Sequence, residues 1–383
     1  MKMYLYNFFI SLHFIGAVLV PFYTEWAGLT LTHALILQSW FLFSVFLLEI
    51  PSGTFADYFG RKNSIVLAVL ANIAGALVYS FIPNFFLFMI GEFLWALAVA
   101  LMSGADYAML YDTLRKTKKT KNSKKIFSRY ESSGLLGLMV GAPVGSFIAS
   151  IYGLQAPMFY LIVPFSIAFF IALTFKEPSC SRTKEKNYLE ILRKGVKYFY
   201  KHKILKILAL DMIVISTASY FMIWLYQPLL TNVGINIAYF GVVQATLVLS
   251  EILIMNNFDK LEKLFGSKRR LLFFSSIITG LMFVLGGLTL YLPIVLMVII
   301  IGGGFGLSRK PLFNNYYNKY IPSDKRATVL SSISMINRFS IAIVNPFVGI
   351  LADWSLSYTF IIIGTVAIIF SFVSRIEEDM LVD

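Results

Sequence analysis

Three ionisable residues stand deep inside long apolar stretches of this sequence, where no water is at hand to solvate a charge. They are Glu92, Glu251 and Arg338. A charged side chain at the centre of a lipid bilayer costs about 2.5–3.5 kcal/mol on insertion scales, so such residues usually belong to a transport pathway or to an ion pair. A carboxylate shielded from water can take up and release a proton near neutral pH. We therefore expect Glu92 or Glu251 to carry a proton.

Two further residues of this kind allow more than one interpretation. Arg338 lies about halfway along its apolar stretch, and it either pairs with a carboxylate such as Glu251 or binds an anionic substrate. Asp211 lies nearer the end of its stretch and is a further candidate for binding a proton or substrate. Both alternatives for Arg338 remain open at the level of sequence.

A second group of charged residues lies in the segment Gly53-Thr54-Phe55-Ala56-Asp57-Tyr58-Phe59-Gly60-Arg61-Lys62. Asp57 and Arg61 are four residues apart, so their side chains can pair with each other and with nearby helix ends. Gly60 permits a tight turn between two helices. Such a cluster, broken and re-formed, would be a latch between conformations; the alternative is an ordinary charged loop. Glu49 shares a helix face with Gly53 and Asp57, and it either supports the latch or carries a proton.

An aromatic and polar group ends the seventh apolar stretch. It consists of Trp224, Tyr226 and Gln227. These side chains are candidates for lining the mouth of a substrate cavity. The alternative is a belt of aromatic residues at the lipid–water interface, where such rings are enriched.

The elements that position these residues are apolar stretches long enough to cross a bilayer. The chain has 383 residues, of which 58% are hydrophobic and 14% charged, so lipid surrounds most of it. A membrane-spanning helix needs about 20 apolar residues, and helices satisfy their backbone hydrogen bonds without water. We expect twelve such helices, roughly at residues 4–24, 33–56, 63–82, 84–112, 128–152, 156–176, 203–231, 236–258, 268–290, 292–318, 327–352 and 355–375.

The basic residues indicate how these helices are oriented. The chain has 33 Lys and Arg against 20 Asp and Glu, and every second loop between the apolar stretches is basic. By the positive-inside rule, these loops and both chain termini lie in the cytoplasm. We expect 32 of the 33 basic residues at this side or at the helix ends that face it, and Arg338 as the exception. The net positive charge therefore describes membrane orientation, and we expect no nucleic-acid partner.

The sequence also contains an internal repeat. Phe265-Gly266 follows Phe59-Gly60 by 206 residues, and Gly349 follows Gly145 by 204 residues. The agreement predicts two related halves, each with six helices. We expect a bundle over residues 1–176, a cytoplasmic linker over 177–202, and a second bundle over 203–383.

These motifs resemble those of a known family. The segment from Gly53 to Lys62 is similar to the G-x-x-x-D-x-x-G-R-[RK] signature of the major facilitator superfamily, and a degenerate second copy lies at Glu262–Arg269. The resemblance implies an all-α integral membrane fold of twelve helices in two pseudo-symmetric bundles, and secondary transport by alternating access. It also implies that Asp57 and Arg61 stabilise the outward-open state by tying the halves together.

The fifth apolar stretch carries a stripe of small residues. Gly137, Gly141 and Gly145 recur every four residues, with Pro143 between them, a pattern that lets helix backbones approach closely. The stripe resembles the antiporter signature of drug-exporting members of the superfamily, although the proline is displaced by one position and the last glycine is Ser146. In the fourth stretch, Glu92 stands where members of the family often have an arginine that assists proton transfer.

We expect a secondary transporter that exports small amphipathic or cationic compounds in exchange for protons. The alternatives are uptake or exchange of an anionic metabolite held by Arg338, and a membrane receptor that transports nothing. The sequence lacks metalloprotease, serine-hydrolase and phosphate-loop motifs, so we expect no enzymatic activity, cofactor or metal. The expected setting is a multi-pass monomer in a prokaryotic plasma membrane, in contact with lipid, substrate and protons.

Overall fold

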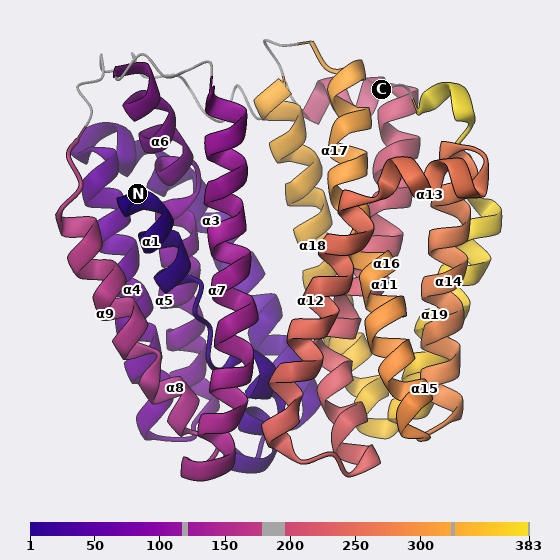
Figure 1. Cartoon of the computed structure of the whole chain (residues 1–383), viewed down its shortest axis with the longest axis horizontal. Helices are drawn as coiled ribbons and strands as arrows, with labels where there is room; N and C mark the ends of the chain where they lie inside the picture. Colours follow the sequence, from indigo (N-terminus) through magenta and orange to yellow (C-terminus); the bar gives the residue numbers. More distant parts are fainter. Residues whose placement is uncertain (117–121, 178–195, 323–325, 382–383) are drawn as a thin grey trace. The chain divides into compact units, whose positions relative to one another are not determined.

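A computed structural model describes residues 1–116, 122–177, 196–322 and 326–381 of the chain. The Asp57 side chain and the surroundings of Gly53 lie outside this description. The described residues are almost entirely helical and contain no strand, which confirms the expected all-α fold (Figure 1). The chain forms two compact units: the first comprises Met1–Lys186 with Asn236–Ala245, and the second comprises Asn187–Ile235 with Thr246–Asp383.

Apolar composition explains the lengths of the helices. Within the described residues, eleven helices are long and apolar enough to cross a membrane. The helices of the first unit are α1 (Lys2–Ile10), α2 (Leu19–Pro21), α3 (Leu31–Phe59), α4 (Arg61–Phe81), α5 (Phe85–Met102), α6 (Ala105–Lys116), α7 (Ser123–Tyr152), α8 (Ala156–Tyr160) and α9 (Ile162–Leu173). Glycine brings α4 and α5 together, because a Cβ atom at Gly75 would lie 2.5 Å from the Trp95 ring.

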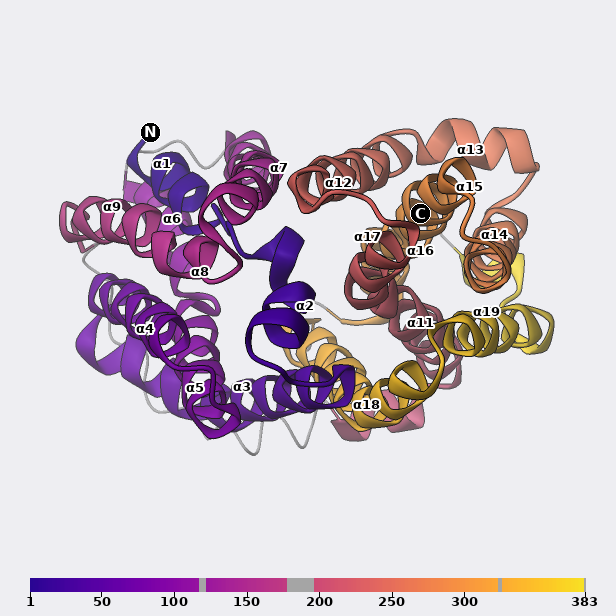
Figure 2. The ribbon, with the colours of Figure 1, turned by 90° about the horizontal axis from the view of Figure 1, so that it is seen from below.

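The first expected span is not one continuous helix. After α1 the backbone is not helical until a 3-10 turn at Gly16–Val18, and α2 is followed by a π-helical turn at Phe22–Trp26 (Figure 2). Short-range hydrogen bonds replace helical ones here: the His13 N–H donates to Ser11 O at 2.8 Å, and the Phe14 N–H donates to Leu12 O at 3.1 Å.

The glycine stripe of α7 explains where the first span unwinds. A Cβ atom at Gly145 would lie 1.7 Å from Phe14 O, and a Cβ atom at Gly141 would lie 3.0 Å from His13 N; both partners belong to the irregular segment. A Cβ atom at Gly137 would lie 2.4 Å from Phe8 O, at the end of α1. The irregular backbone thus lies directly on α7, where only glycine leaves room. Irregular backbone at membrane depth is tolerated when protein buries it. The glycine stripe thus packs against the first span. Pro143 lies inside α7.

The second unit contains α11 (Lys203–Val233), α13 (Phe258–Phe265), α14 (Lys268–Leu288), α15 (Leu292–Met297), α16 (Gly303–Leu307), α17 (Arg309–Tyr320), α18 (Arg326–Trp354) and α19 (Leu356–Val373). The helix α12 (Phe240–Asn256) begins in the first unit and ends in the second. Figures 1 and 2 show α14 and α19 side by side, and their contact runs through glycine: a Cβ at Gly280 would lie 2.8 Å from Gly364 O.

Both copies of the internal repeat place a glycine with positive φ between two helices. Helix α3 ends at Phe59, Gly60 follows with a φ of +94°, and α4 begins and runs for 21 residues. In the second unit α13 ends at Phe265, Gly266 has a φ of +86°, and α14 also runs for 21 residues. A positive φ favours glycine, so the repeated Phe-Gly pair marks a turn between two helices in each unit. The turns differ in ψ, which is 152° at Gly60 and −11° at Gly266.

Candidate functional site

Glu92 lies at the centre of a buried cluster in the first unit. Helix α5 carries it, and its side chain is 1% exposed. Its Oε1 atom accepts hydrogen bonds from the Tyr79 hydroxyl at 2.7 Å, the Gln38 amide at 2.9 Å and the Tyr23 hydroxyl at 3.1 Å. The donors come from α4, α3 and the π-helical turn of the first span. We call Glu92, Tyr79, Gln38 and Tyr23 the Glu92 cluster.

Aromatic rings pack against the Glu92 cluster. The Tyr79 ring stacks on Phe88 at 4.6 Å and on Trp95 at 4.9 Å between centroids. Gly91 makes room for this arrangement, since a Cβ atom there would lie 2.5 Å from the Tyr79 ring. The rings have little polarity of their own, so the hydroxyl and amide donors are what stabilise a negative charge on Glu92.

The donors of the Glu92 cluster are all neutral. No Lys, Arg or His among the described residues forms an ion pair with Glu92. A buried carboxylate that lacks a positive partner is a group that a proton or a cationic ligand can neutralise. The sequence prediction placed Glu92 as a deep acid, but it did not identify Tyr23, Gln38 or Tyr79 as its partners.

The expected latch around Arg61 has partners that the sequence did not reveal. A guanidinium nitrogen of Arg61 pairs with an Asp112 carboxylate oxygen. The Glu177 carboxylate accepts hydrogen bonds from the backbone N–H groups of Arg61 at 2.9 Å and Lys62 at 2.7 Å, so it caps the start of α4. The expected pairing of Arg61 with Asp57 involves a side chain outside the described residues, as does any role of Gly53.

The second unit repeats this cap. The Glu378 carboxylate accepts hydrogen bonds from the backbone N–H groups of Lys268 at 3.0 Å and Arg269 at 2.8 Å, at the start of α14. Burial alone would raise the pKa of Glu378, but these hydrogen bonds hold the pKa of the carboxyl below its ordinary value of 4.5. The sequence prediction identified neither Glu177 nor Glu378; the one feature they share in the sequence is a position shortly after α9 and α19.

A buried ion pair in the second unit involves an arginine that the sequence prediction did not single out. Arg309, which begins α17, is 2% exposed and bonds through Nη2 to Asp211. Its Nη1 donates to the Leu272 carbonyl at 2.6 Å and to the Ser276 hydroxyl at 2.7 Å. Asp211 is therefore an ion-paired residue. Arg309 and Lys310 lie inside the candidate span Leu292–Tyr320, and the sequence prediction did not single them out. The expectation that Arg338 is the one basic residue away from the cytoplasmic side stays a prediction.

Lys310 also changes the interpretation of Arg338. Lys310 interacts electrostatically with both Glu251 and Arg338. Within the described residues no direct ion pair joins Glu251 to Arg338, so the structure relates them through a lysine that the sequence prediction overlooked. Two positive groups and one negative group gather here, on α17, α18 and α12.

The remaining predicted residues lie apart from these clusters. Glu49 is half-buried on α3. Trp224, Tyr226 and Gln227 are all buried on α11. Their predicted role at a cavity mouth stays a prediction.

An apolar groove of about 470 Å³ lies between α11, α18 and α19 in the second unit. Its walls include Phe221, Val344, Phe347 and Val366, and Thr217 and Ser340 are its hydroxyl-bearing residues. Such a surface accommodates hydrocarbon better than it accommodates a hydrophilic solute.

Comparisons with known proteins agree with the architecture. The chain is 29% identical over 153 residues to an uncharacterised transporter of Buchnera aphidicola, a match that spans 40% of this chain and 37% of that protein. It is 20% identical over 344 residues to the uncharacterised MFS-type transporter YxaM of Bacillus subtilis, covering 86% of this chain and 84% of YxaM. Among solved structures, a single-site mutant of the nucleoside transporter NupG has the same fold, with a TM-score of 0.82 at 10% identity over 100% of this chain and 99% of that one.

A family model matches most of the sequence directly. The model of the Major Facilitator Superfamily matches residues 4–345. This range includes the Glu92 cluster, the Arg61–Asp112 pair and the buried Arg309–Asp211 pair. The chain therefore belongs to the Major Facilitator Superfamily and is an integral membrane transport protein, not an enzyme.

Proposed function

We propose that this transporter exports small amphipathic or cationic compounds in exchange for protons, and that Glu92 is the group the proton and the cargo share. The Glu92 cluster carries the proposal. A carboxylate that is 1% exposed and has only neutral partners is costly to leave charged, so neutralisation by a proton or a cation favours it. Competition between the two for one carboxylate is a simple mechanism of exchange.

Protonation would also change the structure around Glu92. The ionised carboxylate accepts hydrogen bonds from Tyr23, Gln38 and Tyr79 on one oxygen. A proton weakens the acceptor and therefore loosens the ties between α3, α4, α5 and the first span. The first span already contains a π-helical turn at Phe22–Trp26 and an unwound segment, features often found where helices change shape. This couples the charge on Glu92 to the conformation of the first unit.

Two observations support a cationic or amphipathic cargo. Aromatic rings near a carboxylate attract organic cations through both charge and π-electron density. The apolar groove of about 470 Å³ beside α11 shows that the second unit also presents a surface suited to hydrocarbon. The glycine stripe of α7, with its partial similarity to an antiporter signature, points the same way.

The test is transport in proteoliposomes with ethidium, a cationic aromatic dye, as probe. We expect an imposed pH gradient to drive ethidium movement by the wild-type protein, and internal pH to change in step. Glu92→Gln should abolish the pH dependence while leaving the protein folded. The matched control is Glu377→Gln, an exposed acid beyond α19. Dye movement that responds equally to the gradient in wild type and Glu92→Gln would overturn the assignment of Glu92.

A second candidate function is transport of an anionic metabolite. The observation in its favour is the group formed by Lys310, Arg338 and Glu251, which carries more positive than negative charge. Under this proposal, Arg338→Ala abolishes uptake of a small carboxylate such as lactate or citrate in a panel, and Arg338→Lys restores part of it. Loss of folding in Arg338→Ala, with no carboxylate transported by the wild type, would contradict it.

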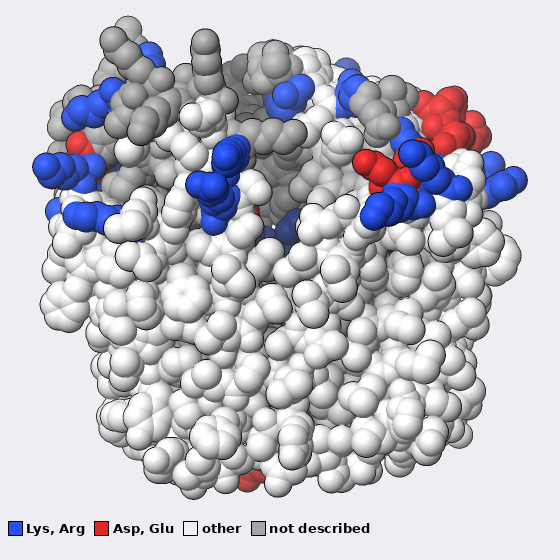
Figure 3. Space-filling view, viewed as in Figure 1, with Lys and Arg blue, Asp and Glu red and all other residues white. Residues whose placement is uncertain are grey.

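We further propose that the protein is a monomer in a prokaryotic plasma membrane with both termini in the cytoplasm. Figure 3 shows that, in each unit, the Lys and Arg side chains on the drawn face gather at one end, as the positive-inside rule requires of a cytoplasmic end. The single cysteine, Cys180, belongs to the predicted cytoplasmic linker, outside the described residues. A membrane-impermeant maleimide should label it only after cells are permeabilised, and labelling of intact cells would contradict this orientation.

A further inference from the structure

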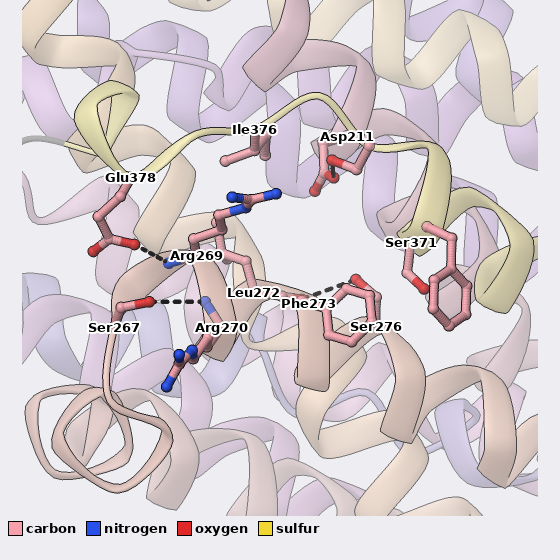
Figure 4. Close-up of a pocket in the computed structure, with 12 residues that line it drawn as sticks. Asp211, Ser267, Arg269, Arg270, Leu272, Phe273, Ser276, Ser371, Ile376 and Glu378 are labelled. Carbon is pink, nitrogen blue, oxygen red and sulfur yellow. Dashed lines mark hydrogen bonds between the residues drawn. The ribbon is translucent and has the colours of Figure 1, made fainter.

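A polar cavity of about 510 Å³ lies in the second unit, where α14 begins and α19 ends (Figure 4). Its lining includes Asp211, Arg269, Arg270, Phe372 and Glu378. The transport mechanism proposed above uses none of its free groups. We call it the α14–α19 cavity.

Both acidic groups of the α14–α19 cavity are already engaged. The Glu378 carboxylate accepts the backbone N–H groups of Lys268 and Arg269. Asp211 pairs with Arg309 through one oxygen and accepts the Ser374 hydroxyl through the other at 2.6 Å. Arg309 compensates the charge of Asp211, so the lining carries the two charges of Arg269 and Arg270 against the one of Glu378. The cavity therefore has a net positive charge.

Arg269 is the group that offers this charge. Its backbone is fixed by Glu378, and its guanidinium forms no hydrogen bond or ion pair with any residue in the part of the chain that is described. Figure 4 shows this guanidinium turned toward the side of the cavity where Asp211 lies, while the Arg270 side chain extends the other way. A guanidinium with unused donors fits the oxygens of a phosphate group in bidentate fashion.

The cavity adjoins an apolar face that belongs in lipid. The Phe273 and Phe372 rings meet edge to face at 5.3 Å in its wall, and Phe372 is 70% exposed. Exposed apolar side chains continue along both helices; they include Leu281, Leu285 and Ile369. A ligand with a phosphate head and hydrocarbon chains would match the charge at one end and the exposed face below it.

We propose that the α14–α19 cavity binds the phosphate group of an anionic phospholipid, held by Arg269, with the acyl chains along the α14–α19 face. Basic pockets between membrane helices at the cytoplasmic side are suited to such head groups. The inference requires that the second unit spans a membrane and does not depend on which cargo the protein carries. It gives Arg269 a role that positive-inside topology alone does not provide.

The test uses the purified full-length protein in detergent and a thermal-shift titration with two lipids of equal chain length. Dioleoyl phosphatidylglycerol should raise the unfolding temperature of the wild type, and dioleoyl phosphatidylcholine should have less effect. Arg269→Gln should weaken the apparent affinity for phosphatidylglycerol about fivefold, the effect expected for one basic residue at a membrane surface. Arg269→Lys should keep most of the affinity. Lys263→Gln, an exposed cation of α13 outside the cavity, is the matched control.

Several outcomes would overturn the proposal. Equal responses to both lipids would remove the head-group specificity, and a full response of Arg269→Gln would remove the role of Arg269. Stabilisation by inorganic phosphate alone, with no further effect of lipid, would replace the lipid with a free anion. If Arg269→Gln lowers stability even without lipid, native mass spectrometry can count the phosphatidylglycerol molecules that the folded protein retains. Fewer retained lipids in Arg269→Gln than in the wild type would support the proposal, and equal numbers would overturn it.

Discussion

The Glu177 carboxylate accepts a hydrogen bond at 2.9 Å from the backbone N–H of Arg61, a residue 116 positions earlier in the chain. The contact joins the end of the first unit's last helix to the start of α4, immediately after the turn at Gly60. Glu378 holds the start of α14 in the same way. In each unit, a carboxylate from outside the turn motif thus caps the helix that follows the charged turn.

Removing the Glu177 cap should destabilise the first unit. Glu177→Ala leaves two backbone N–H groups of α4 without their acceptor, and loss of such a cap typically costs about 0.5–2 kcal/mol. The unfolding temperature in detergent should fall, and Glu177→Gln, which keeps an oxygen acceptor, should fall less. Glu377→Ala removes an exposed acid of the same kind and should change little; an equal loss in that control would show that the cap is unimportant.

The Glu378 cap should make stability depend on acid pH. The pKa of Glu378 lies below its ordinary value of 4.5 in the folded protein, so the ionised form is stabilised by folding. That contribution is fully present above pH 4.5 and is lost as the pH falls through the lower folded pKa. Unfolding temperatures measured between about pH 6 and about pH 3.5 should therefore decrease less for Glu378→Gln than for the wild type. Parallel curves for the two proteins would contradict the cap, and Glu377→Gln should follow the wild-type curve.

Gly145 should tolerate no side chain. A Cβ atom there would lie 1.7 Å from Phe14 O, and both partners are backbone, so the unwound segment of the first span would have to move. Overpacking of this kind usually costs about 1–3 kcal/mol. We expect Gly145→Ala to lower both the yield of folded protein and its unfolding temperature. The control Val144→Ala, at an exposed neighbouring position, should behave as wild type; a stable Gly145→Ala protein would exclude the close approach of these two segments.

The Arg309–Asp211 pair should be more costly to break than to replace. Removing one partner of a buried ion pair leaves an uncompensated charge and costs about 3–5 kcal/mol. Arg309→Met alone should therefore destabilise the protein strongly, and Asp211→Leu in the same protein should recover part of the loss. Unfolding temperatures of the two single variants and the double variant measure this coupling. Additive losses would show that the two charges do not compensate each other.

The sequence determined the elements and the turns between them. Runs of about 20 apolar residues must be helices in lipid, because no water is available to their backbone groups. Phe59-Gly60 and Phe265-Gly266 each mark a turn between two helices, because a positive φ strongly favours glycine. The depth of Glu92 was also apparent, since its neighbours on both sides are apolar.

Only the tertiary structure decided which groups meet. Arg309 bonds to Asp211 across 98 residues, and Glu92 bonds to Tyr23 across 69 residues, and no local pattern specifies either pairing. The first span has the composition of a helix, yet it unwinds where its backbone lies on the glycine stripe of α7. Hydropathy reports only whether a segment prefers lipid; hydrogen-bond partners and close backbone contacts depend on the surface that packing brings against it.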